Sequence, residues 1–190
     1  MWSVGFYKIA WDLDVPVDFV HDEFITAHEL SKYETLLVPY QPIITDRTAK
    51  IFKEYLENGG KIIAEASLGR FKDHGWKAGD APHGMQDVFG CATRGIYAKM
   101  DTVKIKMNKE TLSGTDFWEF YEPTTGKVLG THEDGRSAVI ESTYGKGSTL
   151  LIGTVIGKAY EQNRFESIRN LLTPYLKAEV QSKGINPWLS

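Results

Sequence analysis

Apolar residues recur at helical spacing in three stretches of the chain. In residues 2–13 they lie three and four positions apart, as one buried helix face requires. Residues 46–57 repeat that spacing behind Thr45 or Asp46, either of which suits a helix N-cap, and a glycine pair follows as a C-terminal stop. Residues 163–180 carry the third pattern. The sequence therefore predicts amphipathic helices over these three ranges.

Runs of apolar and β-branched residues predict strands between the first two helices and after the second. They cover residues 15–20, 36–40 and 61–66. The run at 36–40 is continuously apolar, which is typical of a strand buried on both faces. Because strands and helices alternate in this half of the chain, we expect parallel strands joined by crossover helices.

The second half of the chain has a different pattern. A polar, glycine-rich loop at 67–84 and a short helix at 84–89 lead into strands and tight turns from about residue 93 to 154. The expected fold class is α/β, a three-layer, mostly parallel sheet flanked by helices, with an additional antiparallel β region at about 93–154. The length of 190 residues suits a single α/β domain over residues 1–190.

Charge and composition limit the classes of partner that the chain is expected to bind. The formal net charge of −3 and the pI near 6.0 give no electrostatic footprint for nucleic acid. No apolar run approaches the roughly 20 residues needed to cross a bilayer. We therefore expect neither a nucleic-acid nor a membrane partner. The single cysteine, Cys91, rules out an intramolecular disulfide and agrees with a cytoplasmic location.

Two residues are candidate nucleophiles. Cys91 follows a short helix and enters a strand, which is not the strand-to-helix elbow that such a nucleophile occupies, so a buried small hydrophobe is favoured. Ser67 ends a predicted strand, where open α/β sheets bind ligands, but only Gly69 of a Gly-x-Ser-x-Gly elbow is present. We expect no catalytic residue and keep Ser67 as a candidate for a ligand or interface contact.

The loop at 67–84 supplies the other candidates, His74, Trp76 and His83. Imidazoles could bind a transition metal and an indole face could stack on a sugar ring, but the spacing matches no metal motif. Neither a phosphate-binding loop nor a dinucleotide fingerprint is present. We therefore expect no metal and no cofactor, and a contact to a ligand or to a neighbouring subunit at these residues.

Several segments, in this order and at this spacing, resemble one known family. They are Pro16-Val17-Asp18-Phe19-Val20, Leu36 to Tyr40, Asn58-Gly59-Gly60, Tyr144-Gly145-Lys146-Gly147 and Leu151-Ile152-Gly153-Thr154. Together they resemble the trimerisation (middle) domain of glycoside hydrolase family 42 β-galactosidases. That domain is built like class I glutamine amidotransferases, within the flavodoxin-like group, but lacks their catalytic residues.

The resemblance implies an accessory, oligomerisation domain that is not catalytic by itself. Its partners would be other copies of itself, in a trimer, and an upstream TIM-barrel domain of the same polypeptide that carries the catalytic carboxylates. Such a domain opens with a central strand, whereas this chain starts within the first helix. We therefore expect a fragment of a longer protein whose first central strand is missing.

Two other functions stay open. One is a sugar- or small-molecule-binding module that uses loop 67–84. The other is a free-standing amidotransferase-like hydrolase, which would need the elbow nucleophile that the sequence does not supply.

Overall fold

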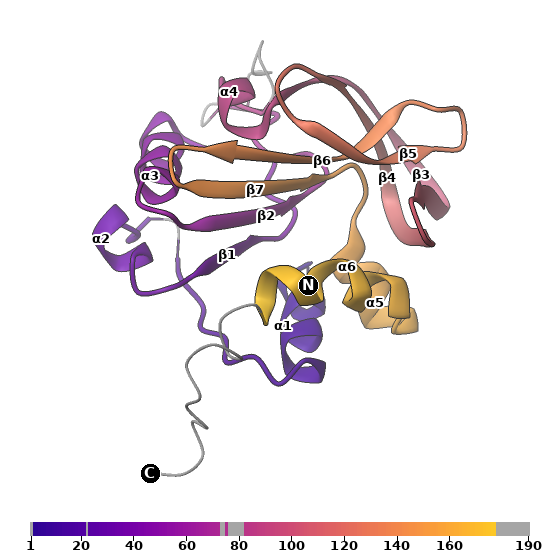
Figure 1. Ribbon diagram of the computed structural model, residues 1–190, viewed down its shortest axis with the longest axis horizontal. Helices are drawn as coiled ribbons and strands as arrows, with labels where there is room; N and C mark the ends of the chain where they lie inside the picture. The colour runs from indigo at the N-terminus through magenta and orange to yellow at the C-terminus, as the bar shows by residue number, and fades with distance from the viewer. Residues whose placement is uncertain (1, 22, 73–74, 76–81, 178–190) are drawn as a thin grey trace.

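The computed structural model describes residues 2–21, 23–72, 75 and 82–177. The helices are α1 (Trp2–Asp12), α2 (Ala27–Leu30), α3 (Asp46–Glu57), α4 (Gln86–Phe89), α5 (Ile156–Asn163) and α6 (Glu166–Leu176). The strands are β1 (Thr35–Val38), β2 (Lys61–Glu65), β3 (Cys91–Met107), β4 (Thr111–Pro123), β5 (Lys127–His132), β6 (Ser137–Tyr144) and β7 (Gly147–Ile152). Within the described residues these strands form one sheet in the order β1-β2-β7-β6-β4-β3-β5 (Figure 1).

Among the strands of the described residues, β1, β2 and β7 form the parallel part of the sheet. β1 pairs with β2 and β2 with β7, both in parallel. Helix α3 covers one face of this part, and α1, α5 and α6 lie on the other side (Figure 1). The crossover through α3 explains the parallel register of β1 and β2, because parallel neighbours need a long connection.

Strands β3 to β6 close on themselves. β3 pairs antiparallel with β4 and with β5, and β6 pairs antiparallel with β5 and with β4. These four strands therefore form a closed barrel, and β7 joins it to the parallel part through its antiparallel pairing with β6.

The expected three-layer, mostly parallel α/β sheet is wrong. In the described residues the sheet is mostly antiparallel, four of its strands form a barrel, and few helices accompany it. The strands expected over 93–154 exist, but they make up most of the sheet instead of an addition to it. The physical reason is that connections of two to four residues join the successive strands from β3 to β7, which leaves no room for crossover helices.

Several individual elements agree with the sequence pattern. Thr45 caps α3, since its Oγ1 accepts the N–H of Thr48 at 3.1 Å, and Gly59 ends the turn with a φ of 99°. The apolar positions of α3 are buried as expected, namely Ala49, Ile51, Phe52, Tyr55 and Leu56. Helix α1 buries Phe6, Ile9, Ala10 and Leu13.

Other elements differ from the pattern. Residues 15–20 form neither a helix nor a strand. Leu36 and Leu37 are half-buried, because β1 lies at the edge of the sheet. Helix α5 was not expected, and α6 starts at Glu166, three residues later than the predicted helix at 163–180.

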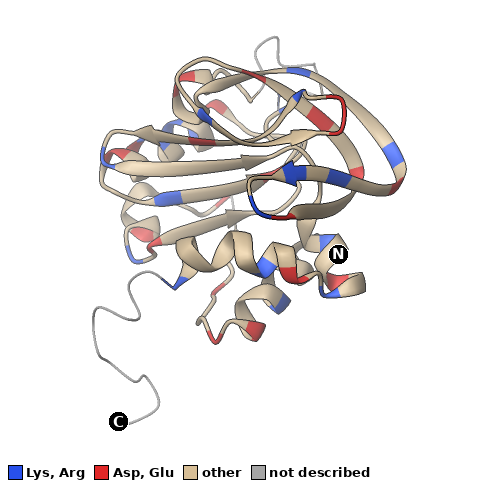
Figure 2. Ribbon diagram, turned by 45° about the vertical axis from the view of Figure 1, so that its right-hand side comes forward, with Lys and Arg blue, Asp and Glu red and all other residues tan. Residues whose placement is uncertain are grey.

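Two apolar clusters stabilise the fold. One lies between α3, α4 and one face of the sheet, and it contains Phe52, Leu56 and Phe89. The other runs from α1, α5 and α6 into the barrel, where Val103 and Ile105 join it. None of the helices in the described residues is long and apolar enough to span a membrane. Figure 2 shows acidic and basic residues interspersed over strands and helices on the side in view.

Candidate functional site

Ser67 lies in a buried turn at the carboxyl end of β2. Its φ of 73° is in the left-handed region, which an L-residue adopts only when its surroundings hold it there, and its side chain is 2% exposed. The N–H of Ser67 donates to Glu119 Oε2 at 2.7 Å. Tyr121 donates its hydroxyl to the same oxygen at 3.1 Å. The strained turn is thus held by a carboxylate from β4, on the wall of the barrel.

Glu119 is a buried acid held in place by hydrogen bonds. Burial raises the pKa of its carboxyl, and the Ser67 N–H and Tyr121 hydroxyl partly offset that effect. Burial also raises the pKa of Tyr121, and the neighbouring Glu119 raises it further. The side chain of Glu119 is 2% exposed, so a substrate cannot reach it without local opening. The arrangement supports a structural connection between β2 and β4.

A second buried acid, Glu65, ends β2. Its Oε2 accepts the N–H groups of Ile156 and Gly157 at 2.9 and 3.0 Å, and its Oε1 accepts the N–H of Tyr40 at 3.0 Å. Burial raises the pKa of Glu65 to about 7, against the opposing effect of these three donors. The first turn of α5 has no side-chain cap of its own, so Glu65 supplies the acceptor that the helix end requires.

The remaining loop candidates are only partly described. His74 and Trp76 lie outside the described residues. His83 follows Pro82 with a φ of 45°, its N–H donates to the Gly69 carbonyl at 3.1 Å, and its Nε2 lies 2.8 Å from Asp46 Oδ1. His83 therefore lies beside the turn that contains Ser67, but its imidazole is directed to the start of α3. Its Nδ1 is buried and has no hydrogen-bond partner among the residues that the structure describes.

Cys91 lies in the apolar cluster on the α3 side of the sheet. It is fully buried and not in a disulfide, and burial raises the pKa of its thiol to about 12. The thiolate that a nucleophile needs is therefore disfavoured. This agrees with the interpretation of Cys91 as a buried small hydrophobe. Among the described residues, no group of three or more His, Cys, Asp or Glu side chains is placed to hold a metal ion.

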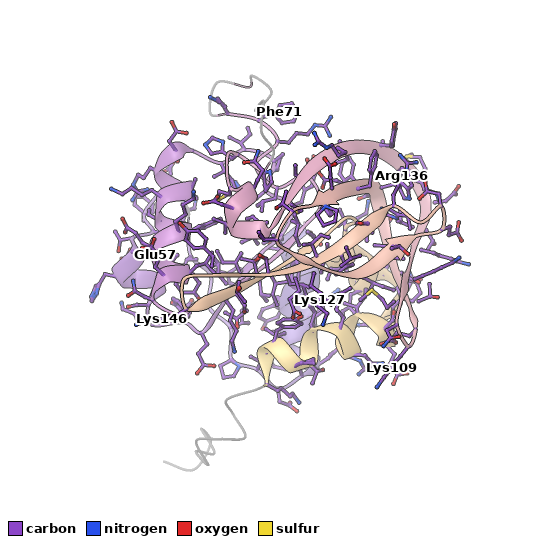
Figure 3. All side chains as sticks on the ribbon, turned by 45° about the horizontal axis from the view of Figure 1, so that its top comes forward. Glu57, Phe71, Lys109, Lys127, Arg136 and Lys146 are labelled. Atoms are coloured by element: carbon purple, nitrogen blue, oxygen red, sulfur yellow. The ribbon has the colours of Figure 1, made fainter. Side chains whose placement is uncertain are left out.

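The sequence reasoning missed an aromatic surface on the barrel, formed by Tyr97, Trp118, Phe120 and Arg136. We call these four residues the barrel patch. Tyr97 is opposite Trp118 in the β3–β4 register, and their ring centroids are 5.6 Å apart. The Arg136 guanidinium lies 4.1 Å from the ring centroids of both Trp118 and Phe120. Tyr97 is 57% exposed, and Figure 3 places Arg136 at the barrel end of the molecule.

A second apolar surface lies around α1 and the segment after it. Trp11 is 67% exposed, Phe19 65% and Phe24 72%. Tyr7 contacts Trp11 and Phe19 with centroid separations of 6.2 and 6.0 Å. Large exposed apolar patches on a folded chain mark surfaces that bind other macromolecules or ligands. The barrel patch lies on the barrel, whereas this second surface lies on α1 and the segment after it, beside the parallel part of the sheet.

Comparison with known protein families shows which family the chain belongs to. Residues 4–179 match the family described as the beta-galactosidase trimerisation domain. The chain belongs to this family. Among curated relatives, the beta-galactosidase GalA of Bacillus licheniformis is 22% identical over 175 residues, with 85% of this chain and 24% of that protein covered. The beta-galactosidase LacA of Lactobacillus acidophilus is 26% identical over 163 residues, with 80% and 23% covered.

Solved structures share the fold of this domain. A polyextremophilic beta-galactosidase from the Antarctic haloarchaeon Halorubrum lacusprofundi superposes with a TM-score of 0.77 at 18% identity, over 91% of this chain and 26% of that chain. A cytoplasmic protein from Salmonella typhimurium LT2 superposes with a TM-score of 0.70 at 12% identity, over 92% of this chain and 85% of that chain. The chain thus spans about a quarter of the length of the β-galactosidases that it matches.

Proposed function

We propose that this chain is the accessory, oligomerisation domain of a larger β-galactosidase-type glycoside hydrolase and is not catalytic by itself. The domain family and the partial coverage of the relatives support this proposal. About three quarters of each relative's length lies outside the match, which leaves room for a separate catalytic domain, expected to be a TIM barrel. The catalytic carboxylates would belong to that domain.

Inaccessible polar groups support a non-catalytic role. Glu65 and Glu119 are each at most 2% exposed. The donors to Glu65 and the Ser67 N–H that donates to Glu119 come from other parts of the fold, and Tyr121 adds a bond to Glu119 within β4. A glycosidase needs two carboxyl groups that reach both sides of a scissile bond. The buried position of Ser67 likewise disfavours the free-standing hydrolase.

The barrel patch is the main structural support for a role in self-association. Tyr, Trp and Arg are the side chains most enriched at the energetic centres of protein interfaces, and here all three types lie together on one surface. Met100, also on β3, is 97% exposed and adds a further exposed apolar side chain to the barrel. We propose that this surface contacts a second copy of the domain and that three copies close into a ring.

Sedimentation equilibrium of the purified chain tests the proposal. The expected mass is three times the 21.4 kDa of one chain, falling toward 21.4 kDa on dilution. Tyr97→Asp should shift this equilibrium to single chains, because it places an unpaired charge in an apolar contact. The matched control is Trp11→Asp, which introduces the same charge at an exposed aromatic outside the barrel patch. Equal effects of the two substitutions would contradict the assignment of this surface.

A second candidate is a protein that consists of this domain alone. The Salmonella protein favours it, since 85% of that chain is covered by this one. The size of the native gene product separates the two cases by immunoblot. A band several times larger than 21.4 kDa supports the accessory domain, whereas a band near 21.4 kDa supports the free-standing form. In that form Ser67, His74, Trp76 and His83 would be the proposed contacts to a ligand.

A further inference from the structure

His132 lies buried against the barrel patch. It ends β5, none of its surface is exposed, and its imidazole centroid is 4.5 Å from the ring centroid of Trp118. Trp118 in turn contacts Tyr97 and Arg136 of the patch. The patch is therefore packed on an imidazole, the side chain whose ordinary pKa lies closest to neutral pH.

One ring nitrogen of His132 has a hydrogen-bond partner, and the other has none among the described residues. Nε2 lies 2.8 Å from the backbone carbonyl of Glu119, which can only accept, so Nε2 carries the proton and donates it. Nδ1 is buried, and no described residue supplies it with a partner. The packing thus fits a neutral imidazole, because a second proton would lie on a buried Nδ1 without an acceptor.

The surroundings of His132 oppose a positive charge on its ring. Burial lowers the pKa of His132 below its ordinary value of 6.5, and two cations, Arg136 and Lys99, lower it further. The Glu119 carbonyl and Asp134 act in the opposite direction. The cations come from two sides, Lys99 from β3 and Arg136 from the turn after β5.

The anionic side chains near His132 are engaged elsewhere or exposed. Asp134 already accepts the Arg136 Nε at 2.7 Å. On β4 the Glu119 carboxylate accepts from the two donors described above. Glu133, the next residue along the chain, is exposed to solvent. A proton on the imidazole therefore favours opening of this packing, because the opened form hydrates the charge.

The backbone of His132 closes the turn that carries Arg136. The His132 N–H donates to the Arg136 carbonyl at 2.8 Å, and the Gly135 N–H donates to the His132 carbonyl at 2.9 Å. β6 follows this turn directly and begins with the uncharged Ser137. Because His132 contacts Trp118 through its ring and Arg136 through its backbone, a movement of His132 displaces both members of the patch.

We propose that His132 is an acid-sensitive switch of the barrel patch, which on gaining a proton leaves its packing against Trp118 and disrupts the patch. Below pH 6.5 an opened imidazole gains a proton that the packed one excludes, so acid favours the opened form. Glu65 and Glu119, whose pKa values are raised, act in the opposite direction. The consequence for assembly, separation of the copies in acid, rests on the proposed function.

The test follows Trp118 by fluorine NMR in the full chain labelled with fluorotryptophan. Trp118→Phe assigns its resonance. The resonance of Trp11, which is 67% exposed, is assigned by Trp11→Phe and serves as the internal control. Between about pH 7 and about pH 5 the Trp118 resonance should move toward its position in the urea-unfolded chain, whereas that of Trp11 should change little. A Trp118 resonance that stays in place overturns the proposal.

Two matched substitutions assign the acid response to one histidine. His132→Gln retains a group that can donate to the Glu119 carbonyl but cannot gain a proton, so the Trp118 resonance should stay in place in acid. Glu65 and Glu119 are unchanged in this variant. His28→Gln removes the same titrating group at an exposed position of α2 and should keep the acid response. An equal response in His132→Gln and the unmodified chain overturns the proposal.

Nitrogen NMR of the unmodified chain with labelled histidine keeps the test independent of how well His132→Gln folds. At about pH 7 His132 should be neutral, with its proton on Nε2. It should gain a second proton over the same pH range in which Trp118 moves. A His132 that is already protonated at about pH 7, or one that gains its proton while Trp118 stays in place, overturns the proposal.

Sedimentation equilibrium at the same two pH values separates this inference from the proposed function. If both hold, the dissociation constant of the trimer should rise at least about tenfold in acid, and His132→Gln should abolish that rise. Movement of Trp118 in a particle with the mass of one chain at both pH values supports the switch and contradicts self-association. A trimer that persists in acid although Trp118 moves supports the switch and contradicts assembly through the barrel patch. A trimer at both pH values in which Trp118 stays in place supports self-association and overturns the switch.

Discussion

The barrel and the parallel part of the sheet differ in their strand edges. In the barrel, β5 pairs with both β3 and β6, so the ladder returns to its start. In the parallel part, β1 ends the ladder and leaves a groove beside it. Closure removes the edges that invite pairing with other chains, whereas an open edge needs a cover. The barrel therefore has no open edge, whereas the parallel part keeps one at β1 among the described strands.

This difference assigns a role to each apolar surface. On the barrel, aromatic side chains project from strands whose backbone groups are already paired, so the surface offers side-chain contacts to a partner. Beside β1, apolar side chains line the groove next to a strand whose one strand partner among the described residues is β2. The first arrangement suits side-chain contact between folded domains, whereas the second also leaves the backbone of an edge strand beside the groove.

The largest expected difference in the free energy of unfolding is between a buried residue of the barrel and a residue of the edge strand β1. Ile105 is fully buried in the barrel, and Ile105→Ala should lower the free energy of unfolding by about 3–4 kcal/mol, from lost burial and the cavity that remains. Leu36 is half-buried at the open edge, and Leu36→Ala should cost only about 1 kcal/mol. Urea unfolding followed by circular dichroism measures both. Equal losses would mean that β1 is as well packed as the barrel.

Substitution of Glu65 tests how much its hydrogen bonds to α5 stabilise the parallel part. Glu65→Gln should lower the free energy of unfolding by about 3 kcal/mol, because an amide has one acceptor oxygen for the three N–H donors and buried donors lose their partners. Glu122→Gln on the exposed end of β4 is the control, and we expect a change below about 0.5 kcal/mol there. A small effect at Glu65 would show that α5 docks without this carboxylate.

The raised pKa of Glu65 predicts a pH dependence. Between its ordinary value of 4.5 and its folded value of about 7, the folded state keeps a proton that the unfolded state has lost. Stability should therefore fall as the pH rises through this window, by about 2–3 kcal/mol in total. The buried Glu119, whose pKa is also raised, acts in the same direction. Urea midpoints near pH 5 and near pH 7 measure the slope, which should be smaller in Glu65→Gln.

Removal of the α3 N-cap should have the smallest effect on the free energy of unfolding. Thr45→Ala removes the hydroxyl that accepts the Thr48 N–H, so we expect a loss of about 1 kcal/mol. Thr26→Ala at the cap of the four-residue helix α2 should cost less, because that helix is short and mostly exposed. Thermal unfolding of the two variants compares them. A larger loss at Thr26 would contradict the expectation that the cap of the longer helix α3 contributes more to stability.

Local signals explain which elements could be predicted. The cap at Thr45, the apolar face of α3 and the stop at Gly59 all lie within one short stretch of chain, so sequence spacing suffices. Residues 15–20 have the composition of a strand, but a strand exists only with a partner, and no strand in the described chain pairs with them. Helix α5 was missed because its first turn is stabilised by Glu65, 91 residues away.

The fold class and the barrel patch depend on pairings that periodicity does not encode. Residue alternation identifies β3, β4 and β5 as strands but is silent on whether β5 returns to pair with β3. Tyr97 meets Trp118 through a register that irregularities near residues 93–95 and 99–103 determine. The burial of Ser67 likewise follows from Glu119, which reaches it from the barrel.

The number of copies in one particle is the most direct test of the account. Native mass spectrometry of the unmodified chain should show a species of three chains that Tyr97→Asp reduces to one and Trp11→Asp leaves intact. A single chain of 21.4 kDa at every concentration that remains soluble would contradict the central claim that this domain assembles through its barrel.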